Sequence, residues 1–139
     1  MEKIRLGLKA VTATFLHAEP TGEARWRAAP FRGLARWWFR AIVGASLPPE
    51  EVRKCEEALF GSAESPSPVT FRIFPEADSA NRSSKVPINP GGRMGADRYA
   101  LRSGSRAVLE IFASGGGPGA RDFLRQAYAA LWVAMHLGG

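Results

Sequence analysis

The order in which hydrophobic periodicity changes along the chain constrains the fold more than any other feature of this sequence. Residues 4–16 alternate apolar side chains with a period of two and include β-branched residues, which indicates a strand. Residues 30–43 repeat with a helical period between Pro30, which suits a first turn, and Gly44, which suits the position after the last turn. Residues 120–137 form the most regular amphipathic helix. A fold that combines strands with long helices is expected.

Shorter elements lie between these segments. Residues 48–60 begin with two prolines and are predicted to form a short helix that ends at Gly61. Residues 69–74 (VTFRIF) are strong β-formers and predict a strand. Residues 99–102 and 106–113 predict a hairpin-like pair of strands around a Ser-Gly turn. The predicted order is therefore strand, helix, short helix, strand, loop, strand, helix.

This order predicts an α+β fold, a ferredoxin-like or RRM-like βαββαβ unit that lacks its last strand. We expect residues 1–139 to form a single domain that is truncated at its C-terminal end, the last strand being absent or supplied by another segment. Residues 75–98 are rich in Pro, Gly, Ser and Asn, and they are predicted to be a long flexible loop that is either functional or disordered.

Composition narrows the class of protein. The chain has 139 residues, enough for one domain with a core, and its 45% of hydrophobic residues is ordinary for a globular protein. It has neither an apolar run of membrane-spanning length nor an N-terminal signal peptide. Its one cysteine, Cys55, forms no internal disulfide or zinc site alone and is expected in the core. We expect a cytoplasmic protein with no metal, cofactor or membrane partner.

Basic and aromatic residues are concentrated in residues 25–40. The whole chain has 19 Lys plus Arg against 13 Asp plus Glu, a net charge of +6, yet this segment contains no acid. Three of the four tryptophans, Trp26, Trp37 and Trp38, also lie in it. Guanidinium groups bind phosphates through forked hydrogen bonds, and an exposed Trp26 or Trp37 could stack on a base. The segment therefore predicts contact with the backbone of a nucleic acid, although a solvated helix face remains the alternative.

Helical phasing divides this segment into faces. With Phe31 at zero, Arg32, Arg36 and Arg40 fall at about 100°, 140° and 180°. The predicted buried face is Phe31, Leu34, Ala35, Trp38 and Ile42. Gly33 falls beside the arginines, where its missing side chain would let a backbone approach closely. The residues predicted to bind the nucleic acid are Arg25, Arg27, Arg32, Gly33, Arg36, Arg40 and Trp37.

Residues 30–40 (PFRGLARWWFR) resemble the first-helix motif of the RAMP superfamily of CRISPR effector proteins, most of all that of the large RAMP subunit of Cmr-type (III-B) complexes. The matching positions are Arg32, Gly33, Arg36 and Arg40. Residues 58–61 (ALFG) are similar to the L-F-G sequence that follows the second helix in that family. The chain departs from the motif at Pro30, Arg32 and Ala35, where the family usually has Ser, Lys and Leu.

The resemblance implies a single RAMP domain of RRM-like fold. It implies a non-catalytic subunit of a type III CRISPR effector complex, which acts in antiviral defence and contacts guide RNA or its duplex with target RNA. The implied partners are guide RNA, target RNA and the other RAMP subunits of the complex. These properties come from the resemblance, whereas the basic helix is read from the residues themselves.

Further candidates carry weaker signals. A basic loop that becomes ordered on RNA would place Arg82, Lys85, Arg93 and Arg98 in contact with it. RAMP relatives that cleave RNA use a histidine or a loop aspartate, which singles out His17 and Asp97, with Asp78 as a further loop aspartate. The alternatives to an RNA-binding subunit are accordingly a RAMP-fold ribonuclease acting on guide or target RNA, and a protein–protein adaptor.

Overall fold

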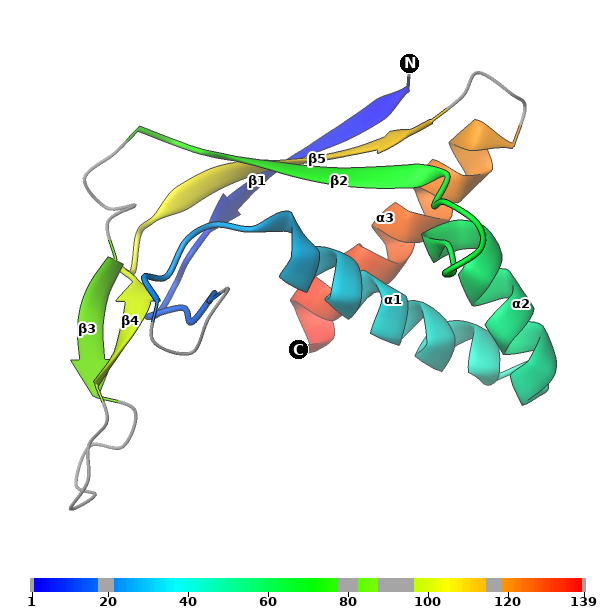
Figure 1. The fold of residues 1–139 in the computed structure, drawn as a ribbon, viewed down its shortest axis with the longest axis horizontal. Helices are drawn as coiled ribbons and strands as arrows, with labels where there is room; N and C mark the ends of the chain where they lie inside the picture. Colours follow the sequence, from blue (N-terminus) through cyan, green and yellow to red (C-terminus); the bar gives the residue numbers. More distant parts are fainter. Residues whose placement is uncertain (1, 18–21, 78–82, 88–96, 115–118, 139) are drawn as a thin grey trace. The chain divides into compact units, whose positions relative to one another are not determined.

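The computed structural model describes residues 2–17, 22–77, 83–87, 97–114 and 119–138. These residues form an α+β fold with two antiparallel sheets and three helices (Figure 1). The elements in chain order are β1 (Lys3–Lys9), α1 (Ala28–Gly44), α2 (Pro49–Phe60), β2 (Val69–Pro75), β3 (Ser83–Pro87), β4 (Asp97–Leu101), β5 (Arg106–Ala113) and α3 (Ala120–Leu137). None of the three helices is long and apolar enough to span a lipid bilayer, as far as the described residues show.

The larger sheet has the strand order β1-β5-β2, so that β5 is central. Main-chain hydrogen bonds from Ala113 N to Glu2 O (3.4 Å) and from Ser114 N to Pro68 O (2.7 Å) join the end of β5 to the starts of both neighbours. This pattern makes β5 antiparallel to β1 and β2. The smaller sheet pairs β3 with β4, antiparallel, with Ser83 opposite Leu101.

The chain divides into two compact units, and the first contains all three helices. Unit 1 comprises residues 1–5, 28–72 and 110–139, and unit 2 comprises residues 6–27 and 73–109. Within unit 1 the helices lie on one face of the strands (Figure 1). The core under them contains Leu59, Phe60, Val69, Ile111 and Leu131, which are all 2% exposed or less.

Unit 2 is built around the β3–β4 pair and the segment after β1. Thr14 forms an isolated bridge to Leu101 through reciprocal main-chain hydrogen bonds of 3.1 and 2.9 Å. Trp26, 8% exposed, donates from its indole nitrogen to the hydroxyl of Ser105 (2.8 Å). Trp26 is therefore a core residue with a satisfied indole, and the suggestion that it stacks on a base was wrong.

The predicted helices and the strand at Val69 are confirmed, whereas the first strand is shorter than predicted. It ends at Lys9; Ala10 still bonds to the turn before β5 (Ala10 N to Ser105 O, 2.8 Å), and the residues after it leave this pairing. Residues 10–16 keep a strand-like composition, but only Thr14 finds a main-chain partner of strand type among the described residues.

Two expectations about residues 75–113 were wrong. Ser83–Pro87 is a strand within the segment predicted to be a loop, while residues 78–82 and 88–96 lie outside the described residues. The predicted hairpin between residues 99–102 and 106–113 does not form, because β4 pairs with β3 and β5 pairs with β1 and β2. A turn does lie between them, with Gly104 at φ 89°, but it redirects the chain from one sheet to the other.

Candidate nucleic-acid interface

Helix α1 is rotated about its axis relative to the prediction. Its buried residues are Ala35 (0% exposed) and Phe39 (6%), whereas Ile42 is 45% exposed. The centre of the buried face therefore lies about 60° closer to the arginines than expected. Trp38, predicted in the core, is half-buried and donates from its indole nitrogen to the carbonyl of Gly138 (3.2 Å). This rotation turns the arginine stripe toward α2.

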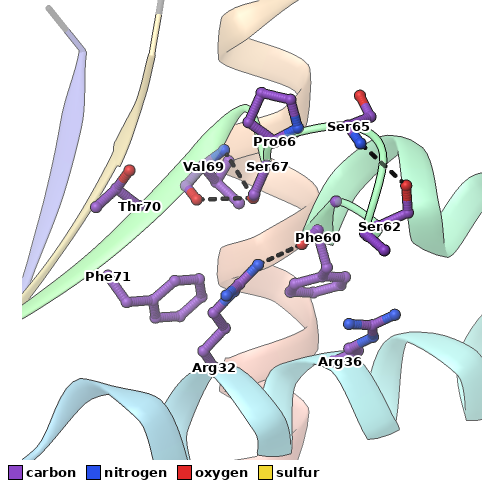
Figure 2. A pocket seen from close by; sticks show the side chains of 12 residues that line it. Arg32, Arg36, Phe60, Ser62, Ser65, Pro66, Ser67, Val69, Thr70 and Phe71 are labelled. Atoms are coloured by element: carbon purple, nitrogen blue, oxygen red, sulfur yellow. Dashed lines mark hydrogen bonds between the residues drawn. The ribbon is translucent and has the colours of Figure 1, made fainter.

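Arg32 binds the C-terminal end of α2. Its guanidinium donates to the main-chain carbonyl of Phe60, the last residue of that helix (Figure 2). The last carbonyls of a helix have no partner within the helix and carry partial negative charge, so a cation stabilises them. The basic residue of the first motif thus meets the L-F-G sequence of the second, and at least one guanidinium of the stripe has a structural role.

Arg36 and Arg40 share one buried carboxylate. Arg36 Nε donates to Glu56 Oε1, and Arg40 Nε lies 3.7 Å from Glu56 Oε2. The Glu56 side chain is 8% exposed, whereas those of Arg36 and Arg40 are 39% and 50% exposed. We call these three residues the helix cluster. The premise that the stripe has no compensating acid was therefore wrong, because the acid comes from α2.

Glu56 was not among the site residues predicted from the sequence, although its position on α2 could have indicated it. It lies on the apolar edge of α2, in phase with Val52, Leu59 and Phe60. A carboxylate on a buried helix face requires a partner, since burying an unpaired charge is costly. The free arginines of α1 were the available cations, but the sequence alone could not tell which face of α1 would meet α2.

Both arginines contact Glu56 through Nε. Among the described residues, neither donates a hydrogen bond from its terminal Nη atoms. A guanidinium has five N–H groups in a fixed fork, so its terminal edge can bind a phosphate while Nε stays on the carboxylate. The helix cluster therefore presents two oriented donor edges with one net positive charge.

A polar pocket of about 650 Å³ lies beside these arginines (Figure 2). Arg32 and Arg36 rise from α1 on one side of it, and the turn of residues 61–67 closes the other side. Its lining comprises Arg32, Arg36, Phe60, Gly61, Ser62, Ala63, Ser65, Pro66, Ser67, Val69, Thr70 and Phe71. Hydroxyls and guanidiniums dominate this lining, and such groups suit a phosphate or sugar better than an apolar ligand.

The turn behind the pocket is held by its own hydrogen bonds. Ser67 Oγ lies 3.0 Å from the carbonyl oxygen of Leu59 and 2.8 Å from that of Val69, both acceptors for its one hydroxyl proton, and Ser62 N donates to Ser65 O (2.8 Å). Gly61 has φ 78° and ψ 167°, a region that only glycine occupies readily. An added Cβ there would lie 2.7 Å from Ser67 N and 2.8 Å from Ser65 O. The glycine of L-F-G is therefore required by local backbone packing.

Gly33 and Trp37 lie on the exposed side of α1. A Cβ added at Gly33 would meet nothing within 4 Å, so packing within the chain does not explain the glycine. Trp37 is 54% exposed and meets Trp38 edge to face, with ring centroids 5.0 Å apart. An open glycine and an exposed indole one turn apart offer room for a backbone and a surface for a base.

Arg25 and Arg27 belong to unit 2 and differ in their surroundings. Arg25 is exposed, and its Nη2 lies 3.6 Å from Oε2 of Glu23, a residue just outside the acid-free segment 25–40. Arg27 donates from Nη1 to the main-chain carbonyl of His17 (2.6 Å). Arg27 thus has a structural contact, while Arg25 keeps most of its surface in solvent.

The candidates for catalysis and loop contacts are dispersed. His17 is half-buried, with an Nε2 that has no partner among the described residues. Asp97 and Arg98 are exposed at the start of β4, and the ammonium of Lys85 lies 5.5 Å from the Tyr99 ring centroid. Arg82, Arg93 and Asp78 lie outside the described residues. Within the described ranges no group of three or more His, Cys, Asp or Glu is placed to hold a metal.

Cys55 lies on α2 and is half-buried, so it is less enclosed than the expected core cysteine. The residues of α2 that are fully enclosed are its neighbours Leu59 and Phe60, both 0% exposed. The apolar edge of α2 therefore meets the core mainly through its last turn.

The chain is therefore an α+β protein with a basic first helix, and the arginines of that helix contact the end of the second helix. The chain belongs to the RAMP superfamily, whose family model matches residues 8–139. It is 33% identical over 67 residues to the CRISPR system Cmr subunit Cmr1-2 of Pyrococcus furiosus; the match covers 47% of this chain and 36% of that protein.

Solved structures show the same fold. The crystal structure of Cmr1 from Pyrococcus furiosus, in its apo form, matches with a TM-score of 0.69 and 19% identity over 100% of this chain and 45% of that chain. A chain of the type III-B Cmr-beta complex bound to cognate target RNA matches with a TM-score of 0.61 and 14% identity, covering 97% and 50%. A type IV-B CRISPR complex contains a chain matching with a TM-score of 0.60 and 12% identity, covering 99% and 83%. This chain spans about half the length of the Cmr structures.

Proposed function

We propose that this chain is a non-catalytic RNA-binding module of a Cmr1-like subunit in a type III CRISPR effector complex. In this proposal α1 contacts guide RNA or the guide–target duplex, and the neighbouring RAMP subunits are its protein partners. Support comes from membership of the RAMP superfamily and from the similar chain in a Cmr-beta complex that holds target RNA.

The strand order supports a finer description of the fold. In a ferredoxin-like βαββαβ unit the third strand lies between the first two, and both flanking strands run antiparallel to it. The order β1-β5-β2 has this arrangement, with α1 and α2 after the first strand and α3 after the central one. We infer a ferredoxin-like unit, in which a fourth strand would pair along the edge of β1 that no strand of the described residues occupies.

The observation that carries the proposal is the geometry of the helix cluster. Glu56 fixes Arg36 and Arg40 through Nε and leaves their terminal donors directed elsewhere. Pre-orientation lowers the entropy lost when a phosphate is bound. Gly33 leaves the adjacent surface open, and the pocket beside Arg36 offers hydroxyls to a sugar. Arg32 contributes charge from its site on the Phe60 carbonyl.

Binding of fluorescently labelled single-stranded RNA between 50 and 200 mM salt tests the proposal. Replacing Arg36 and Arg40 with Ala removes two phosphate contacts, so the slope of log affinity against log salt should become shallower by about 1.4. Arg53→Ala is the matched control, because Arg53 is an exposed arginine of α2 held by Glu50 and Glu57. A salt slope that is the same in the double variant, the control and the wild type would refute the role of α1.

The non-catalytic part of the proposal has its own test. RNA incubated with the protein, with and without EDTA, should remain intact. Cleavage that disappears in His17→Ala or Asp97→Ala would establish a ribonuclease instead. RNA affinity absent at every salt concentration, together with salt-insensitive binding of a protein partner, would establish an adaptor.

A further inference from the structure

The strands of unit 1 carry a second group of basic residues on the face that the helices leave open. Side chains alternate along a strand, so the buried Val69, Phe71 and Ile111 mark the face toward the helices. Their neighbours point the other way, and in the described part of unit 1 no helix covers that face (Figure 1). On this open face of unit 1 lie Lys3 and Arg5 of β1, Glu110 and Phe112 of β5, and Arg72 of β2.

Main-chain pairing brings these residues into one row. Counting from the Ala113–Glu2 and Ser114–Pro68 hydrogen bonds, Arg5 and Arg72 both stand opposite Glu110, one on each side. Arg5 Nε lies 3.0 Å and Lys3 Nζ 3.4 Å from Glu110 Oε1. We call Lys3, Arg5 and Glu110 the sheet cluster. Its carboxylate is 14% exposed, whereas the two cations are 50% and 61% exposed.

Arg72 is placed differently from the two cations of β1. Its guanidinium lies 4.7 Å from the centroid of the Phe112 ring, and Phe112 is 9% exposed beneath it. Among the described residues no carboxylate lies within ion-pair distance of Arg72. The aromatic ring therefore supports an exposed, planar cation whose outer face is open to a ligand.

We propose that this open sheet face binds single-stranded RNA as a second surface, separate from α1. Three cations against one partly buried carboxylate give the face a net positive charge, which is complementary to a polyanion. A supported guanidinium plane stacks with an unpaired base, and sheet faces that combine cations with stacking groups bind single strands. Arg72 receives the base, Arg5 and Lys3 receive phosphates, and Glu110 holds the β1 cations in place. This inference does not rest on contacts made by α1.

The test compares two RNA ligands of equal length, a strand of uridines and an abasic ribose-phosphate strand. Replacing Arg5 and Arg72 with Ala removes one phosphate contact and one stacking contact, so it should weaken binding of the uridine strand about tenfold and make its salt slope shallower by about 0.7. Arg72→Lys keeps the charge and loses the plane, so it should weaken binding of the uridine strand severalfold and leave binding of the abasic strand unchanged. Arg53→Ala again controls for loss of one positive charge.

Unchanged RNA affinity in both sheet variants overturns the inference, as expected if an acidic protein surface occupies this face. An equal loss in Arg53→Ala, or an equal loss for both strands in Arg72→Lys, overturns it too. Thermal unfolding of each variant, with a midpoint close to the wild type, confirms that the protein assayed is folded. Loss of RNA binding in the Arg36/Arg40 variant alone refutes binding at the sheet face and supports binding at α1. Loss of RNA binding in the sheet variants alone refutes binding at α1 and supports binding at the sheet face.

Discussion

Two carboxylates of unit 1 each lie between two basic side chains, but they join different kinds of structure. Glu56 links α1 to α2, and these helices share no main-chain hydrogen bonds of their own. Glu110 links β1 to β5, which a ladder of main-chain bonds already joins. The same ion-pair chemistry should therefore matter more for stability between helices than between strands. Each cluster also holds arginine by Nε, which leaves the terminal donor edge of that guanidinium available to a ligand.

The largest expected effect comes from the turn of residues 61–67, which follows α2. Gly61→Ala would place a Cβ within 2.8 Å of two backbone atoms at a φ of 78°. We expect a loss of about 3 kcal/mol or more in the free energy of unfolding, because the clash is with main chain that cannot rotate away. Urea unfolding measures this loss. A loss below about 1 kcal/mol would show that residues 61–67 rearrange easily, and the end of α2 would then be a poor anchor for Arg32.

The next effect tests the two clusters against each other. Glu56→Gln should lower the free energy of unfolding by about 1–2 kcal/mol, since a buried acceptor of a charged hydrogen bond is weakened where no main-chain ladder joins the helices. Glu110→Gln should cost about 0.5 kcal/mol, because its partners are more exposed and the strands remain paired. Equal losses, measured by urea unfolding under one set of conditions, would remove the distinction drawn between helix and strand contexts.

The positions of helices and strands could be predicted from the sequence better than the way these elements pack and pair with one another. Three helices and the strand at Val69 follow from periodicity and from Pro and Gly positions, which are local properties. The burial of Phe39 in place of Ile42 depends on how α1 packs against its neighbours, and no local pattern contains that information. The pairing of β4 with β3 is likewise a long-range choice.

The candidate site follows the same division. The spacing of Arg32, Arg36 and Arg40 on one helix face was readable, and the structure keeps them together. Their ties to Phe60 and Glu56 were not readable, because both partners come from another helix. Basic and apolar residues alternate along β1, and this alternation is visible in the sequence. The ion pairs of the sheet cluster could not be predicted from it, because they depend on β5 lying beside β1.

Gly33→Ala separates stability from binding on α1, beside the helix cluster. Alanine in a helix interior is favoured over glycine, and the added Cβ meets nothing, so the free energy of unfolding should rise by about 0.5–1 kcal/mol. If an RNA backbone passes over Gly33, the same change should weaken RNA binding severalfold. Thermal unfolding and RNA titration of one preparation measure both. A more stable variant with wild-type RNA affinity would show that the nucleic acid does not approach α1 at this position.

The smallest effect concerns a third carboxylate, that of Glu2, whose side chain is 46% exposed and pairs with Arg121. Glu2 accepts hydrogen bonds from Arg121 of α3, from Nε (3.0 Å) and from Nη2 (2.6 Å). This bond lowers the pKa of the Glu2 carboxyl below its ordinary value. A lowered pKa means that the paired, ionised form stabilises the folded chain above the ordinary value, and that this stability is lost as pH falls through the lowered one.

Glu2→Gln should therefore unfold at slightly lower urea than the wild type at pH 7, by less than either cluster variant, because an exposed pair is screened by solvent. The difference should close as the pH is lowered to about 2, where Glu2 is protonated in both states. A difference that stays constant over this range would mean that the side chain acts through packing and not through charge. Glu2 would then no longer serve as the exposed reference for the ion pairs of Glu56 and Glu110.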